Sequence, residues 1–147
     1  MFENLVKNLS SFFEVHQNKE INQQETNEEY TNRILKPILE AIKRELLKFK
    51  GIKKVAIYSN TGILVAEEQV SKENVTFNLK DLSSIISEIQ KLSDKHSSNF
   101  AFSYILLESF GLFIKKPQNE NFYLAVLADK SAPLGAIISF LNRFEVE

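Results

Sequence analysis

Two stretches of the chain carry apolar side chains on both alternating faces, FAFSYILLES at 100–109 and FYLAVLA at 122–128. In the first stretch Phe102, Tyr104 and Leu106 oppose Ile105 and Leu107; in the second Phe122, Leu124 and Val126 oppose Tyr123, Ala125 and Leu127. A strand that is apolar on both faces is covered on both faces. The chain therefore requires a sheet with other elements packed against each side.

Two helices and a hairpin are predicted before these strands. Helical spacing of apolar residues over 34–49 indicates the first helix, with Pro37 in its first turn and Gly51 just past its end. The β-rich runs VAIYS and ILVAEE flank the turn at 60–62, which is typical of a hairpin. The second helix is capped by Asn78. Its apolar stripe consists of Leu82, Ile85, Ile86, Ile89 and Leu92.

The remaining elements are a middle strand, GLFIKKP, and a last helix. We expect a turn at Phe110-Gly111 before the middle strand, and the polar loop 118–121 after it. Pro133 suits the first turn of a helix that runs to about Phe144. The order α-β-β-α-β-β-β-α, with tight turns between strands, predicts an α+β fold, an α/β/α sandwich around a central five-stranded antiparallel sheet.

The chain divides into three segments. Residues 1–13 carry one helical stripe of Phe2, Leu5, Val6, Leu9, Phe12 and Phe13. A helix this short is marginal in water and needs a surface to dock on. Residues 14–33 are polar and are predicted to be a linker, and residues 34–147 form the main domain. We expect the N-terminal helix to dock within a dimer, with capture of a third protein as the alternative.

Composition argues against several classes of protein. The 18 basic and 19 acidic side chains give a net charge of −1, unlike the basic excess of a nucleic-acid binder. No apolar run approaches the ~18 residues of a membrane span. The N-terminus lacks the apolar core of a signal peptide. We therefore expect a cytoplasmic protein that neither binds nucleic acid nor spans a membrane.

Little catalytic chemistry is available. No Ser lies on a strand-to-helix elbow beside His96, and His16 falls in the polar segment. No cluster has the spacing of metal ligands, and the four glycines are too scattered to cradle a phosphate. We expect no enzyme, no cofactor and no metal. The lysines around Lys48 are interpreted as a solvated helix end, although an anionic surface could contact them.

Three segments together resemble the roadblock family, the dynein light-chain-like regulators of Ras-like small GTPases. They are FKGIKKVAIYSNTGILVAEE, YILLESFGLFIKK and FYLAVLADKSAPLGAIISFL, and the resemblance covers about Ile34 to Phe144. It implies a homodimer or heterodimer in which the second helices lie side by side and the middle strands pair across a two-fold axis. An apolar edge strand left open would also be an aggregation hazard.

The resemblance implies two sets of site residues. The dimer interface would contain Ser83, Ser87, Gln90, Phe102, Tyr104, Ile105, Leu106 and Leu107. The outward stripe of the second helix would form the GTPase-binding platform, with Ser84, Glu88, Lys91 and Lys95 from each chain. The alternative for the platform is a solvated helix face, and for the serines ordinary exposure.

Two functions remain open at this point. The first is a regulator of a small GTPase; it would act by conformational bias, because Arg33, Arg44 and Arg143 do not lie on a loop made for insertion. The second is a structural dimerisation scaffold with no GTPase connection. A small-ligand sensor would need a pocket that a sequence does not reveal.

Overall fold

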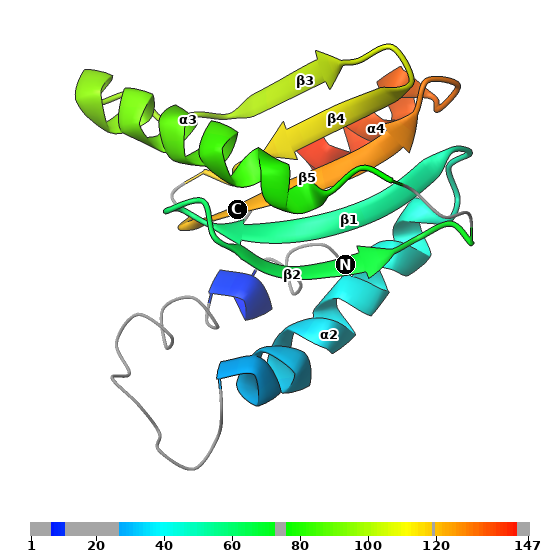
Figure 1. Cartoon of the computed structure of the whole chain (residues 1–147), viewed down its shortest axis with the longest axis horizontal. Coiled ribbons are helices and arrows are strands. Elements are labelled where there is room, and N and C mark those ends of the chain that lie inside the picture. The colour runs from blue at the N-terminus through cyan, green and yellow to red at the C-terminus, as the bar shows by residue number, and fades with distance from the viewer. Residues whose placement is uncertain (1–6, 11–26, 73–75, 119, 144–147) are drawn as a thin grey trace.

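A computed structural model describes residues 7–10, 27–72, 76–118 and 120–143 (Figure 1). Its elements are α2 (Asn27–Leu46), β1 (Ile52–Ser59), β2 (Leu64–Gln69), the 3-10 helix η1 (Leu79–Leu82), α3 (Ser83–His96), β3 (Phe102–Leu106), β4 (Phe110–Lys115), β5 (Phe122–Asp129) and α4 (Leu134–Asn142). The strands form one antiparallel sheet in the order β2-β1-β5-β4-β3. The predicted element order and sheet are confirmed.

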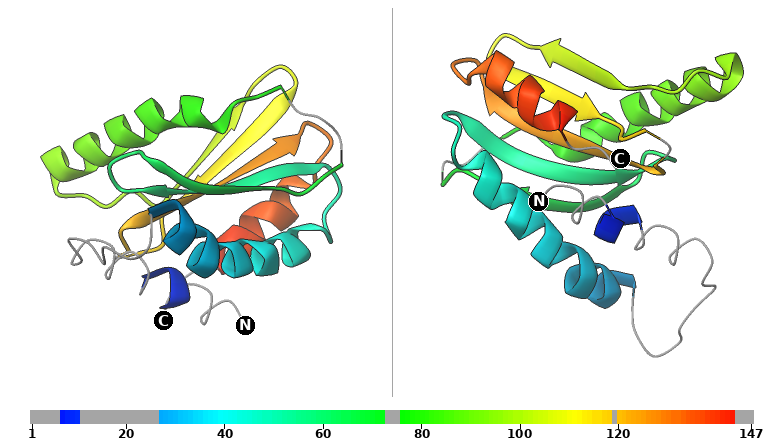
Figure 2. Two further views of the ribbon diagram at one scale, coloured as in Figure 1. Left: turned by 60° about the horizontal axis from the view of Figure 1, so that its bottom comes forward. Right: turned by 180° about the vertical axis from the view of Figure 1, so that it is seen from behind.

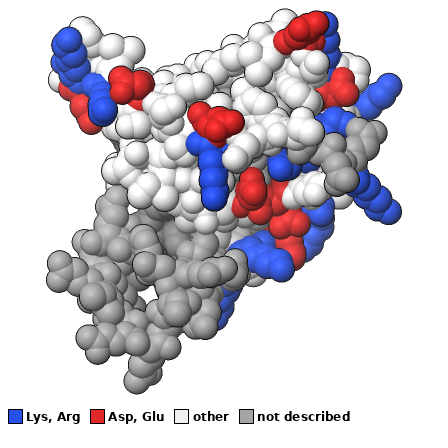
Figure 3. Space-filling view, viewed as in Figure 1, with Lys and Arg blue, Asp and Glu red and all other residues white. Residues whose placement is uncertain are grey.

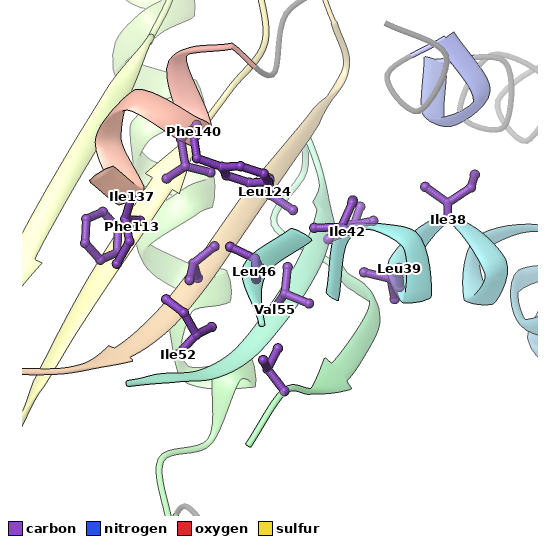
Figure 4. Close-up of a cluster of buried hydrophobic side chains, with 14 of the residues drawn as sticks. Ile38, Leu39, Ile42, Leu46, Ile52, Val55, Phe113, Leu124, Ile137 and Phe140 are labelled. Carbon is purple, nitrogen blue, oxygen red and sulfur yellow. The ribbon is translucent and has the colours of Figure 1, made fainter. Parts of the chain in front are cut away.

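Helices lie on both faces of this sheet (Figure 2). On one face α2 and α4 bury a cluster that includes Ile42, Val55, Leu124 and Phe140, part of which is drawn in Figure 4. On the other face η1 and α3 bury a second cluster, of Ala56, Tyr58, Leu79, Leu82, Ile86, Leu112, Ile114, Tyr123, Ala125 and Leu127. The sheet is therefore the middle layer of three.

The two strands with apolar residues on both faces differ in their position in the sheet and in their burial. β5 lies at the centre, and each residue from Phe122 to Ala128 is buried, as the pattern predicts. β3 lies at the edge and is only half-buried, while Leu106 and Leu107 are 58% and 41% exposed. The expectation that this strand is covered on both faces is wrong for the single chain, because an edge position offers less cover.

The first helix is longer than its apolar pattern indicates. It begins at Asn27 rather than Ile34, so the stretch predicted as a linker is helical from Asn27 onward. The low apolar content of this stretch argues against its burial. It does not prevent helix formation, because each residue added to a helix that has already begun forms one further hydrogen bond. Of the predicted N-terminal helix, residues 7–10 are described and are helical; the rest, and residues 14–26, lie outside the described residues.

The turn expected at Phe110-Gly111 is wrongly placed. Both residues belong to β4, and the chain reverses just before them, where the Leu107 N–H donates to the Phe110 carbonyl at 2.8 Å. Gly111 has another role: a Cβ atom there would lie 2.8 Å from the Tyr104 ring. The glycine leaves room for a neighbouring aromatic side chain instead of forming a turn.

Candidate functional site

The free edge of β3 presents unpaired backbone groups. Among the described strands β3 pairs only with β4. The Leu107 N–H donates to the Phe110 carbonyl at this end of the ladder. In an antiparallel ladder the bonded positions alternate, so Phe102, Tyr104 and Leu106 direct their N–H and C=O groups away from β4. These groups are available to another strand.

The side chains of β3 are uncharged, mostly apolar and partly supported by β4. The Tyr104 ring lies over Gly111 and contacts Phe113, with ring centroids 4.8 Å apart. Leu106 and Leu107 extend beyond this support and are exposed. The strand Phe102–Leu106 contains no charged residue. It therefore lacks the charges that commonly prevent pairing at a sheet edge.

Two tyrosines attach η1 and α3 to the sheet. The Tyr58 hydroxyl donates to the Leu79 carbonyl, and the Tyr123 hydroxyl donates to Gln90 Oε1 at 2.6 Å. Burial raises the pKa of Tyr58, with the charges of Glu67 and Asp81 adding to the effect. Burial likewise raises the pKa of Tyr123 to about 12.

Gln90, predicted at the dimer interface, is half-buried and bonded within its own chain. Besides accepting from Tyr123, it donates through Nε2 to Asp94 Oδ1 at 3.0 Å. Its side chain thus helps to fix the orientation of α3 on the sheet.

The small residues of α3 pack against the chain's own hairpin. A Cβ atom on Gly62 would lie 2.4 Å from the Ser83 carbonyl oxygen and 3.2 Å from Ser87 Cβ. Gly62 also has a φ of +90°, in the region that favours glycine. Ser83 and Ser87 are half-buried. The resemblance implies that they meet their symmetry mates, and within the chain they allow the β1–β2 turn to approach α3 closely.

The opposite flank of α3 is apolar and exposed. Ile85 and Leu92, which belong to the predicted apolar stripe of this helix, are 39% and 61% exposed, and Ile89 between them is half-buried. The flank of α3 against Gly62 faces the β1–β2 turn, at one edge of the sheet. The Ile85–Leu92 flank lies on the other side of the helix and faces the β4–β3 side.

We call this flank (Ile85, Ile89 and Leu92) together with the free edge of β3 (Phe102–Leu106) the α3–β3 surface. In Figure 3 the upper part of the view is mostly uncharged between small groups of charged side chains at the free end of α3, near the middle and at the upper right; further charges gather at the lower right. The surface is apolar on a helix and open for hydrogen bonding on a strand, and it can bind protein by both means.

The four residues predicted to bind a GTPase lie together on the solvent side of α3. Ser84, Glu88, Lys91 and Lys95 are all exposed. Lys91 Nζ lies 3.3 Å from Glu88 Oε1, and both side chains are at least 70% exposed. An ion pair this exposed contributes little to stability. These four side chains are therefore accessible to a partner, and the Lys91–Glu88 ion pair contributes little to the stability of the fold.

The apolar stripe of α3 extends beyond the part of the helix that packs on the sheet. In an α-helix consecutive residues are about 100° apart, so Ile85 and Ile86 point to different sides. Ile86 is fully buried, whereas Ile85 and Leu92 are partly exposed. The sheet therefore covers only one side of the apolar arc.

The described residues offer no evident catalytic centre. No group of three or more His, Asp or Glu side chains among them could hold a metal ion. His96 is exposed at the end of α3. None of the helices in the described part of the chain has the length and hydropathy of a membrane span.

Comparison with known proteins gives matches in structure alone; no family model and no curated protein matches the sequence. The chain is similar to the gliding protein MglB of Thermus thermophilus, with 19% identity and a TM-score of 0.58 over 72% of this chain and 82% of that one. A structure of MglB in a tetrameric arrangement gives the same identity and TM-score, with 72% and 81% covered. A roadblock/LC7 domain from Streptomyces avermitilis has 14% identity and a TM-score of 0.52 over 73% and 93%. The likeness shows the fold, that of the roadblock/LC7 domains.

Proposed function

We propose that this chain, which has the roadblock/LC7 fold, is a dimeric and non-enzymatic regulator or adaptor of a Ras-like small GTPase. The observation that carries the proposal is the α3–β3 surface, which combines an uncharged strand edge with exposed leucine and isoleucine side chains. A GTPase is proposed as the partner because the chain resembles roadblock regulators and its structure is similar to that of MglB.

The proposed dimer joins two copies of β3 across a two-fold axis. Antiparallel pairing of the two edges would satisfy the outward backbone groups of Phe102, Tyr104 and Leu106 in both chains. A two-fold axis also brings the same flank of α3 from each chain to the joint. Full burial of a leucine or isoleucine contributes roughly 1.5–3 kcal/mol, and Ile85 and Leu92, which are 39% and 61% exposed, can gain about half of that at the joint.

The proposed GTPase platform is the solvent side of the paired helices. Dimerisation through the Ile85–Leu92 flank leaves Ser84, Glu88, Lys91 and Lys95 of both chains exposed. A mixed-charge surface of modest area suits a transient partner. One GTPase lying across the axis would contact both chains, so we expect two protomers per GTPase. Regulation requires that the affinity differ between the two nucleotide states.

The direct test is titration of the cognate GTPase, loaded with GDP or with a non-hydrolysed GTP analogue, into this protein by calorimetry. We expect one state to bind at least tenfold more tightly, at two protomers per GTPase. Equal affinity in both states, or no binding in either, would contradict the proposal and leave the dimerisation scaffold as the function.

Two charge-reversed variants locate the platform. Lys91→Glu/Lys95→Glu should weaken binding and slow association, more at low salt than at high salt. The matched control is Lys48→Glu/Lys50→Glu, which changes the net charge equally. Lys48 also pairs with a glutamate three residues away, at 2.8 Å from Glu45, as Lys91 pairs with Glu88 at 3.3 Å. Equal losses in the two variants would indicate a general charge effect and place the partner elsewhere.

A further inference from the structure

Among the described residues near the start of the chain, Leu9 belongs to the core on the α2–α4 face. Residues 7–10 form a helical turn in which Leu9 is fully buried, while Lys7 and Asn8 are exposed. Leu9 belongs to the same buried cluster as Leu35 and Ile38 of α2. The views in Figure 2 show the turn beside the N-terminal half of α2, on the face of the sheet that α3 does not cover.

The sequence around Leu9 has apolar residues at helical spacing. Phe2, Leu5, Val6, Leu9, Phe12 and Phe13 lie on one stripe of a helix, and Leu9 is near its centre. The residue that the structure shows buried is thus a member of a longer apolar stripe. A helix of about a dozen residues does not persist alone in water, so the stripe and its docking site form together.

We propose that the α2–α4 face contains a docking site for an amphipathic helix, and that its occupant is the chain's own segment 2–13, anchored by Leu9 and able to detach as a unit. The site lies across the sheet from α3 and therefore on the face opposite the proposed GTPase surface. The polar residues 14–26 tether the segment to α2, and at ~3.3 Å per extended residue they allow it to leave and return without strain.

Detachment as a unit follows from how the segment is held. Residues 14–26, which connect the segment to α2, contain only Val15 and Ile21 as large apolar residues, so they add little to the docking. Of the four described residues of the segment only Leu9 is buried, and a segment held through few buried side chains opens locally while the rest of a protein stays folded. A detached segment leaves an apolar site on α2, and a helix with the same spacing of apolar residues would compete for it.

The test uses the full chain and a fluorescent peptide of residues 1–16. In the Leu9→Glu chain the charged side chain cannot remain in the core, so the chain's own segment is released and the site is vacant. The wild-type peptide should bind this variant at least tenfold more tightly than the wild-type chain, where the site is filled. A peptide that itself carries Leu9→Glu should bind neither.

The matched control is Leu47→Glu, because Leu47 is also a leucine next to the α2 core but is 57% exposed. Its own segment stays docked, so the wild-type peptide should bind no better than to the wild-type chain. The Leu9→Glu chain should melt roughly 5 °C lower than the Leu47→Glu chain. Equal peptide affinity for all three chains, or no affinity for any, would overturn the proposal.

Hydrogen exchange of the unchanged protein gives a second test if the Leu9→Glu chain does not fold. The amides of residues 7–10 should exchange at least a hundredfold faster than those of β5, and with a common opening, while α2 stays protected. Exchange of residues 7–10 only on global unfolding would show that the segment is a fixed part of the core and would overturn the proposal.

Discussion

The two edges of the sheet are built in opposite ways. β2 carries the adjacent acidic residues Glu67 and Glu68, and Glu68 is held by Lys43 of α2 at 3.5 Å. β3 has no charged residue, and at its end the side chains of Leu106 and Leu107 are exposed to solvent. Charge on an edge strand discourages pairing with another chain, whereas an apolar edge invites it. This chain therefore has one edge protected from association and one suited to it.

The largest effect should come from blocking the backbone of the open edge. The N–H of Leu106 faces away from β4, so Leu106→Pro removes a donor from the free edge while the ladder to β4 is kept. Because the two-fold axis places the substitution in both chains, two hydrogen bonds of the dimer are lost. At about 1 kcal/mol or more per hydrogen bond, the affinity of the dimer should fall by at least tenfold. Sedimentation equilibrium measures this.

The matched change on the other edge is Glu67→Pro. Val70 donates to the Lys53 carbonyl at 2.8 Å, so by alternation Glu67 also faces away from its neighbour β1. This variant should dimerise like the wild type. If Glu67→Pro dissociates the dimer and Leu106→Pro does not, the assignment of the two edges is reversed.

A charge on the α3 flank should have the next largest effect. Leu92→Glu places a carboxylate at the proposed joint, where desolvating it is costly, and the loss of a buried leucine adds about 1.5–3 kcal/mol per chain. Its control is Ile63→Glu at the β1–β2 turn, because Ile63 is 64% exposed and Leu92 61%. Only Leu92→Glu should lower the dimer fraction in size-exclusion chromatography with light scattering. Equal dimer fractions in Leu92→Glu and Ile63→Glu would show that this flank of α3 is not part of the interface.

The attachment of α3 predicts a loss of stability at alkaline pH. The folded-state pKa of Tyr123 is raised to about 12 from 10.0, and that of Tyr58 is raised as well. The unfolded chain therefore loses these hydroxyl protons at a lower pH than the folded chain. The contribution of the two hydroxyls to the free energy of unfolding is complete below pH 10 and declines as pH rises from 10 towards 12. Urea unfolding between pH 8 and 11.5 should show a shallower decline for Tyr123→Phe than for the wild type. Identical slopes would mean that the Tyr123 hydroxyl is not buried as described.

The smallest effect concerns the support of the β3 edge. Gly111→Ala would bring a Cβ atom to 2.8 Å from the Tyr104 ring, and the ring would have to move. We expect a loss of about 1 kcal/mol in the free energy of unfolding. Gly135→Ala, with nothing within 4 Å of its added Cβ atom, should instead be neutral or stabilising by a few tenths to about 1 kcal/mol. Thermal denaturation distinguishes the two, and equal shifts would show that Gly111 makes no room for Tyr104.

The fold could be predicted because its strongest signals are local. β5 has two apolar faces, and burial of both faces leaves it only a central place. Gly62 has a positive φ of +90° in a hairpin turn, as its sequence context indicates. Such features depend on residues close together in the chain.

The errors concern residues whose role depends on distant neighbours. The local pattern predicts a turn at Gly111, but the lack of a Cβ there serves Tyr104 on the adjacent strand. The same kind of pattern places Ile85 and Leu92 on one apolar stripe with the buried Ile86, but spacing along a helix does not say how much of an apolar arc the sheet covers.

Sedimentation velocity of the unchanged protein tests the central claim most directly, that the α3–β3 surface joins two copies of the chain. Across a concentration series up to tens of micromolar, the account predicts a single boundary at the mass of a dimer, and a shift to the monomer mass of 16.9 kDa in Leu106→Pro. A wild-type protein that remains a monomer at tens of micromolar would contradict it.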